Sequence, residues 1–216
     1  QTCALPICLH GVGASVVNAL SQRLDVEVDR DGKVHLMSFQ RGVPGIFDGE
    51  APGSSFTPQS GLRVAGKAPK GVTGTRIRYW ADRQIFHPSA EFDVEALRER
   101  ARQTTFLVPG LAIHLHDHRT SLDTPVETFR FDGGIASFCE FLATDEPVTG
   151  VIRLTGDARF NETVPMLDDK GHMTPRDVER EMHVDIALRW GTGYDVDVRS
   201  FVNIIATPKG GTHLTG

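Results

Sequence analysis

The residues best suited to bind an anion lie near the start of the chain, where Gly11-Val12-Gly13 precedes a helical pattern. Glycines let backbone N–H groups approach a ligand closely, and the start of a helix favours negative charge. A dinucleotide-binding fingerprint needs a third glycine where Val16 stands, and no Gly-Lys-Ser/Thr follows for a phosphate-binding loop. Spacing alone therefore favours an ordinary turn into a helix over a phosphate site.

Three histidines alternate along the segment 114–118, HLHDH. In a strand they would share one face, where they could hold a metal ion. The opposite face carries Leu111, Ile113 and Leu115, which makes the histidines the solvent side of an amphipathic strand. We therefore expect no metal site in this chain.

The second half of the chain offers two further kinds of reactive or binding group. Cys139 stands among aromatic residues with no neighbouring His or Lys, which favours a buried, inert thiol. The arginines could face phosphate groups, but they are scattered over strands and loops and serve equally well as surface residues. They are Arg153, Arg159, Arg176, Arg180, Arg189 and Arg199.

The composition excludes several functional classes. The 216 residues hold 23 Lys and Arg against 28 Asp and Glu, a formal charge of −5. This balance excludes a wholly basic nucleic-acid coat and leaves room for a local basic patch. The sequence has neither a run of about 18 apolar residues nor a signal-type start, so we expect a cytoplasmic, globular protein with no membrane partner.

The first half alternates between helical and strand patterns. Residues 11–22 have helical spacing, 24–29 alternate with period two, and Asp31-Gly32 predicts a hairpin turn into 33–39. A strand is expected at 75–80 and a helix at 93–103, with Asp93 as N-cap and a stop at Pro109-Gly110. Residues 42–71, rich in Gly, Pro and Ser, predict a long surface connection.

The second half begins after a polar stretch at 120–128, where we expect a domain boundary. A short helix follows with Phe138, Phe141 and Leu142 on one side, and strands are expected at 151–154 and 183–190. Residues 156–181 between them are polar and predict an excursion from the fold. Hairpins, few helices and a non-alternating order favour an α+β fold.

The first seven residues, QTCALPI, match the translation of a sequencing-adapter end and are expected to be foreign to the protein. The adapter's last base would also convert a glycine codon into the cysteine codon of Cys8. Without this segment, and with glycine in place of Cys8, Cys139 is the one remaining cysteine, which fits a reducing compartment.

The segment Leu9 to Ser21, LHGVGASVVNALS, resembles the B subunits of bacterial type IIA DNA topoisomerases, the gyrase B and topoisomerase IV B family. Further family motifs follow in order. They are TGT and RYW within 73–80, FLVPGLAIHLHDHR at 106–119, FRFDGGI at 129–135, ALRWGTGY at 187–194 and FVNIIATPKGGTHLTG at 201–216. The last motif and the insertion at 156–181 are more similar to topoisomerase IV B than to gyrase B.

The resemblance implies two partial domains. Residues 8–122 would be the C-terminal portion of a GHKL-type ATPase domain. Residues 126–216 would be the first part of a transducer domain with a ribosomal S5 domain 2-like fold. The alternatives are another GHKL ATPase, of the MutL or Hsp90 type, and a non-catalytic module that binds DNA or protein. The pair TGT and RYW and the final GGTH argue against the MutL and Hsp90 types.

The resemblance also implies the site residues. In this family the glycine motif closes over the triphosphate of ATP, Thr75 matches a residue on the adenine side of the pocket, and Arg30 matches one at its rim. The glycine motif comprises Cys8, Leu9, His10, Gly11, Val12, Gly13 and Ala14, of which Cys8 departs from the family. The catalytic glutamate and the Mg²⁺ ligand would lie upstream, and the transducer lysine beyond Gly216. We therefore assign no catalytic residue to this chain and expect it to be inactive alone.

The partners that the resemblance implies are DNA, the topoisomerase A subunit and a second B subunit that dimerises when ATP binds. Among the arginines, Arg189 and Arg199 are expected to face the DNA.

Overall fold

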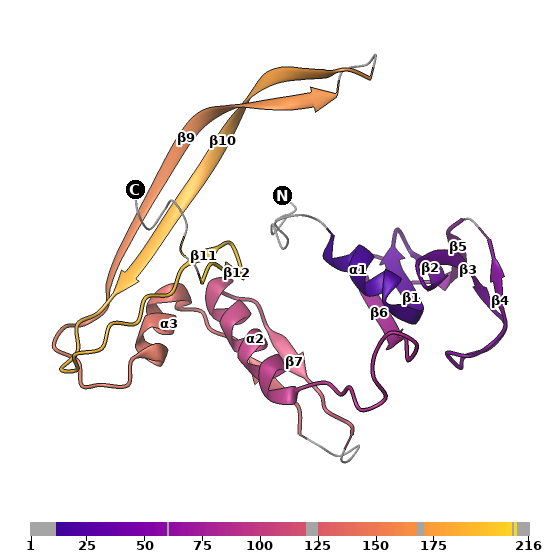
Figure 1. The fold of residues 1–216 in the computed structure, drawn as a ribbon, viewed down its shortest axis with the longest axis horizontal. Coiled ribbons are helices and arrows are strands. Elements are labelled where there is room, and N and C mark those ends of the chain that lie inside the picture. The colour runs from indigo at the N-terminus through magenta and orange to yellow at the C-terminus, as the bar shows by residue number, and fades with distance from the viewer. Residues whose placement is uncertain (1–11, 60, 120–124, 168–170, 209, 211–216) are drawn as a thin grey trace. The chain divides into compact units, whose positions relative to one another are not determined.

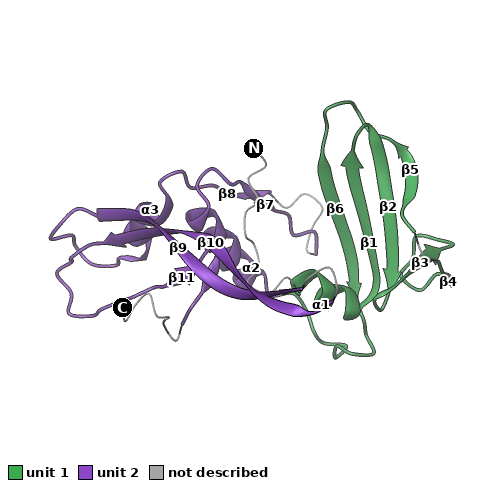
Figure 2. Cartoon of the chain, turned by 90° about the horizontal axis from the view of Figure 1, so that it is seen from above, with its two compact units in different colours: residues 1–92 green, residues 93–216 purple. Residues whose placement is uncertain are grey.

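A computed structural model describes residues 12–59, 61–119, 125–167, 171–208 and 210. The chain forms two compact units, Gln1–Phe92 and Asp93–Gly216 (Figure 2). The segment expected to derive from an adapter, together with Cys8 to Gly11 of the glycine motif, lies outside the described residues. No helix within the described ranges is both long and apolar enough to cross a membrane.

The first unit is an antiparallel sheet preceded by one short helix (Figure 1). The sheet order is β4-β3-β2-β1-β6, and β5 also pairs with β2. The elements are α1 (Gly13–Ala19), β1 (Ser21–Arg30), β2 (Lys33–Gln40), β3 (Val43–Phe47), β4 (Phe56–Pro58), β5 (Arg63–Lys67) and β6 (Gly74–Ala81). The helix after the glycines, the first two strands and the strand expected at 75–80 are confirmed.

Two tight turns set the register of the central strands. Asp31 and Gly32 have φ of 52° and 72°, and Arg41 and Gly42 have φ of 48° and 84°. Positive φ at both central residues defines the hairpin turn whose twist matches that of paired strands. The predicted Asp31-Gly32 turn is therefore confirmed, and Arg41-Gly42 repeats it between β2 and β3.

The prediction of a long surface connection at 42–71 is wrong, because this segment contributes three short strands to the sheet. The strands contain glycine and proline and are three to five residues long, so the sequence carries no alternation to reveal them. These strands are defined by their pairing, since β3 and β5 both pair with β2 and β4 pairs with β3. Gly45 is needed where β3 meets β4, because a Cβ there would lie 2.5 Å from the carbonyl oxygen of Thr57.

The second unit combines two helices with strand pairs. Its elements are α2 (Val94–Leu107), β7 (Ile113–Leu115), β8 (Glu127–Phe129), α3 (Gly134–Leu142), β9 (Ile152–Leu167), β10 (Met173–Leu188), β11 (Phe201–Val202) and β12 (Ile205–Ala206). Asp93 caps α2 as predicted, since its carboxylate accepts from the backbone N–H of Ala96 at 3.2 Å. With both units dominated by strands, the predicted α+β class is confirmed.

Aromatic stacking forms the core of the second unit. The ring of Phe106, only 2% exposed, lies 3.7 Å from that of Phe131 and 4.8 Å from that of Phe138. Phe141 and Phe201 extend the cluster. This core joins α2 to α3 across the stretch 120–128, where the sequence places a domain boundary. The compact units divide between Phe92 and Asp93, and the domain boundary at 120–128 stays a prediction.

The prediction of a polar excursion at 156–181 is wrong, because most of this segment belongs to the long β9–β10 ribbon (Figure 1). Each strand has 16 residues, and residues opposite each other share a face. One face is apolar near the base, where Ile152 lies opposite Leu188 and Leu154 opposite Ile186. The other face is polar, with Arg159 and Glu181 ion-paired at 2.6 Å. Both faces are largely exposed.

Candidate functional site

The described part of the glycine motif begins α1. Val12 is the N-cap residue, and its carbonyl accepts from the N–H of Val16 at 2.9 Å. A side chain at Gly13 would meet no atom within 4 Å, and Val12 and Val16 are about half exposed. Among the described residues, therefore, no side chain or backbone atom packs against Gly13 at the start of α1.

The end of α1 is fixed to the sheet by buried polar groups. The Ser21 hydroxyl donates to the carbonyl of Val17 at 2.6 Å, and the N–H of Asp82 donates to the carbonyl of Leu20 at 3.0 Å. The Asp82 carboxylate, 3% exposed, pairs with Arg41. The hydrogen bond from Arg41 lowers the pKa of Asp82 and keeps it charged. The sheet thus holds α1 from its C-terminal end.

Thr75 and Arg30 lie at the other end of the same sheet. Thr75 of β6 is directly opposite Val28 of β1, and Arg30 stands two residues further along β1. Because side chains two residues apart in a strand share a face, Thr75 and Arg30 face the same side, separated by roughly 7 Å along the strand. Both residues are exposed.

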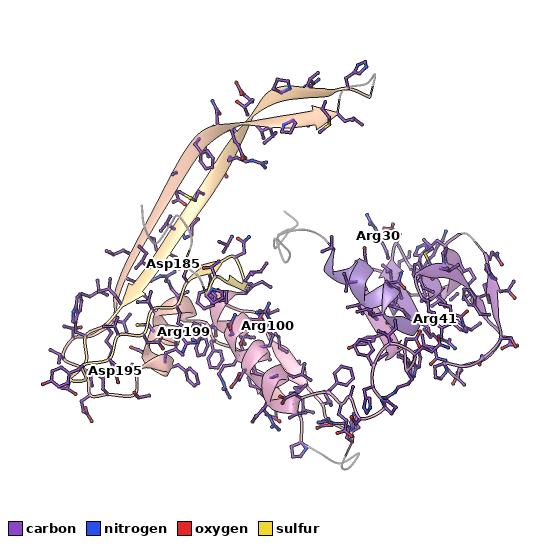
Figure 3. The ribbon with its side chains drawn as sticks, in the orientation of Figure 1. Arg30, Arg41, Arg100, Asp185, Asp195 and Arg199 are labelled. Atoms are coloured by element: carbon purple, nitrogen blue, oxygen red, sulfur yellow. The ribbon has the colours of Figure 1, made fainter. Side chains whose placement is uncertain are left out.

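Arg30, labelled in Figure 3, retains its capacity to bind an anion. Its one ion pair in the described chain is with Asp31, 3.6 Å away, and the two side chains are 75% and 87% exposed. Exposed pairs of this kind hold their partners weakly. Within the described residues, no hydrogen bond joins Thr75 or Arg30 to Val12, Gly13 or Ala14. The structure therefore brings Thr75 and Arg30 to one face of the sheet, while Cys8 to Gly11 of the glycine motif lie outside the described residues.

Arg189, expected to face DNA, is placed inside the second unit instead. Its guanidinium donates to the carbonyl of Asp145 and, at 3.1 Å, to the carboxylate of the same residue. Its side chain is 10% exposed. Arg189 therefore has a structural role, and little of its side chain is accessible to a phosphate.

Arg199 is placed at the surface, with 55% of its side chain exposed. It donates to both carboxylate oxygens of Asp197, at 2.8 and 3.1 Å. The hydrogen bond to Asp197 raises the pKa of Arg199, so the guanidinium stays charged.

The alternating histidines lie on and after β7 as a solvent-facing group. The ring of His114 hydrogen-bonds to the Thr128 hydroxyl at 2.8 Å, and the rings of His116 and His118 are 5.8 Å apart. In the described part of the chain no three His, Cys, Asp or Glu side chains are placed to hold a metal ion.

Burial raises the pKa of Cys139, which disfavours the reactive thiolate.

Two lysines that lie outside the family motifs stand beside Arg30. Lys33 lies directly opposite Arg30 in the β1–β2 ladder, and Lys67 lies opposite Lys33 in the β2–β5 ladder. Only the strand register places these lysines beside Arg30, and the register of β5 cannot be predicted from a single sequence.

Comparisons with known proteins agree over nearly the whole chain. The family model for DNA gyrase B matches residues 134–216. The DNA gyrase B protein of Halalkalibacterium halodurans is 37% identical over 211 residues, which are 96% of this chain and 27% of that protein. The corresponding protein of Thermotoga maritima is 37% identical over 207 residues, which are 96% of this chain and 28% of that protein.

A solved structure of a gyrase B protein has a similar fold. The 43K ATPase domain of Thermus thermophilus gyrase B, in complex with an aminocoumarin, matches with a TM-score of 0.66 and 32% identity. The match covers 95% of this chain and 46% of that one. The fold is thus that of the ATPase region of a type IIA topoisomerase B subunit.

The chain belongs to the DNA gyrase B family. It spans about a quarter of the length of the curated relatives it matches. The resemblance found in the sequence is confirmed at the level of the family, and its closer likeness to topoisomerase IV B stays a prediction.

Proposed function

We propose that the chain is the ATP-binding and transducer portion of an ATP-dependent type II DNA topoisomerase B subunit. Its task is to couple the binding and hydrolysis of ATP to the passage of one DNA duplex through another. The observation that carries this proposal is the match over 95% of the chain to a gyrase B ATPase domain. In this proposal 8–122 belong to the GHKL ATPase domain and 126–216 to the transducer.

The nucleotide site is built from two places in the first unit. Backbone N–H groups of the motif from Cys8 to Ala14 bind the phosphates, for which the open start of α1 leaves space. The hydroxyl of Thr75 contributes to the adenine side, and Arg30 stands at the rim on the same face. Movement of the motif over the nucleotide would link binding to a change in the transducer.

In this proposal the chain contributes to an ATP site, and the described residues offer no set of side chains for Mg²⁺. Mg²⁺ prefers oxygen ligands in octahedral geometry, often one or two carboxylates with substrate phosphates. Across the described ranges no group of three acidic or histidine side chains is placed to hold a metal. The family resemblance assigns the ligand of the Mg²⁺ that accompanies ATP to a residue upstream of this chain.

The proposed partners are DNA, an A subunit and a second B subunit that joins when ATP binds. Arg199 remains the candidate DNA contact of the second unit because its guanidinium is charged and half exposed. Arg189 is not retained as one, because of its burial against Asp145. We place the complete protein in the cytoplasm.

The proposal is tested on the complete B subunit that carries this chain, assembled with its A subunit. We expect ATP turnover that DNA stimulates, and weaker ATP binding in Thr75→Ala by roughly 2–10-fold, as for one lost hydrogen bond. Thr57→Ala, an exposed threonine on β4, is the matched control. Absent turnover would refute the topoisomerase assignment. Equal binding by the two variants would remove Thr75 from the site while leaving the family unaffected.

A further inference from the structure

Three cations form a row across neighbouring strands of the first unit. Arg30 on β1 lies opposite Lys33 on β2, and Lys33 lies opposite Lys67 on β5. Residues directly opposite each other share a face, so the three side chains leave the same side of the sheet. Figure 2 shows β1, β2 and β5 side by side in the first unit. Lys70 follows three residues after Lys67, in a turn joined to the Gly32 turn through the Ala68 N–H.

The row is not neutralised by the protein. Among the described residues, no carboxylate forms an ion pair with Lys33, Lys67 or Lys70, and all three are exposed. Asp31 binds Arg30 weakly, and Asp29 is paired with Arg76 on the opposite face at 3.6 Å. Like charges directly opposite each other destabilise a sheet. A fold that keeps this arrangement in a chain of net charge −5 concentrates positive charge at one place.

The spacing of the row suits a chain of phosphates. Strands lie about 4.8 Å apart, so the row extends over roughly 10 Å. Each strand of duplex DNA carries one phosphate per about 3.4 Å of helix axis, so negative charge recurs along the backbone on the length scale of this row. A single phosphate or carboxylate presents its charge at one point, whereas a backbone presents it repeatedly along the row. Extended, repeated negative charge is the ligand that uses all of them.

We propose that Arg30, Lys33 and Lys67, with Lys70 beside them, form a binding surface for the phosphate backbone of duplex DNA at the rim of the nucleotide site. The surface lies on the face that carries Thr75, two residues further along β1. A duplex held there would contact the first unit, separately from any contact through Arg199 in the second. This inference rests on the proposed function, which supplies DNA as the substrate.

The test compares two double variants that each remove two cations from the same sheet. Lys33→Gln with Lys67→Gln removes the row but keeps Arg30. Arg63→Gln with Arg78→Gln is the matched control, since these residues lie opposite Leu36 and Asp25 and face the other side. The affinity of the full chain for a labelled duplex of about 30 base pairs is measured by fluorescence anisotropy between about 50 and 200 mM salt.

For the Lys33/Lys67 variant we expect the slope of log affinity against log salt to fall by about two, with little change in the control. Thermal unfolding should show no loss of stability in this variant, because the substitutions remove a like-charge pair. Equal losses of DNA binding in the two variants would overturn the proposal. So would displacement of DNA by inorganic phosphate at equal charge concentration. ATP binding, measured on the same variants, separates this outcome from failure of the nucleotide site.

Discussion

The carboxylate of Asp145 accepts a hydrogen bond from the Arg189 guanidinium at 3.1 Å, and it accepts a second from the backbone N–H of Gly193 at 2.8 Å. The hydrogen bond from Gly193 contributes most to lowering the pKa of Asp145. The loop before β9 is thereby tied to the segment after β10, where Pro147 and Gly191 form an isolated bridge. This link closes the base of the ribbon.

Gly191 leaves the space that Asp145 occupies, because a Cβ at position 191 would overlap the carboxylate. Gly191→Ala should therefore lower the melting temperature by several degrees in the wild-type background. In an Asp145→Ala background the same substitution should cost much less, since the overlapping atoms are gone. A double-mutant cycle by thermal unfolding measures this coupling. Additive effects would show that the two residues do not compete for the same space.

Phe106→Ala should destabilise the second unit by about 3–5 kcal/mol, the usual cost of deleting a buried aromatic side chain. The ring is 2% exposed and stacks on two other phenylalanines. Phe160→Ala on the ribbon, where the side chain is 48% exposed, serves as control and should cost less than about 1 kcal/mol. Denaturant unfolding gives both values. Similar losses in the two variants would contradict the placement of the core around Phe106.

Glu127 should make the stability of the fold depend on pH in the acidic range. Hydrogen bonds from Arg98, at 2.5–2.9 Å, lower the pKa of Glu127 in the folded state. A carboxylate with a lowered pKa contributes stability above its unfolded-state pKa of about 4.3, and this contribution is lost as the pH falls below it. The difference in melting temperature between wild type and Glu127→Gln should thus shrink between about pH 6 and pH 3. A difference that stays constant with pH would exclude this role for Glu127.

His114, His116 and His118 should retain no zinc. They lie on and after a short strand, and His114 is already hydrogen-bonded to Thr128. A structural zinc site needs four ligands in tetrahedral arrangement. Equilibration of the protein with zinc, followed by dialysis and metal analysis, should leave far less than one equivalent. One retained zinc per chain, lost on His116→Ala, would overturn this expectation.

The sequence predicts the elements whose signals are local. Asp31-Gly32 specifies its turn by the φ values that it tolerates, and Asp93 caps α2 through a neighbouring N–H. The strands at 43–67 and the outer parts of the ribbon could not be predicted in this way. Their order comes from pairing with distant residues, as for Lys67 with Lys33. In the ribbon, Gly156 and Glu162 interrupt the apolar alternation on a face that remains exposed.

The residues of the candidate site could likewise be predicted only where their signals are local or carried by a family motif. Thr75 and Arg30 come from motif resemblance, and the register of β1 with β6 then brings them to one face. Arg189 shows the limit of that approach, because charge and position in a sequence do not reveal a partner 44 residues away. Lys33 and Lys67 were missed for the same reason.

The β9–β10 ribbon has a mechanical consequence. Sixteen residues per strand give an arm about 50 Å long, and the base of this arm is fixed near Asp145 and α3. Such an arm works as a lever with its pivot at the base. A tilt of about 10° there displaces the tip by roughly 9 Å, given the rise per residue of a strand. Sub-ångström shifts around the pivot are thereby converted into movements at the far end that are several times larger.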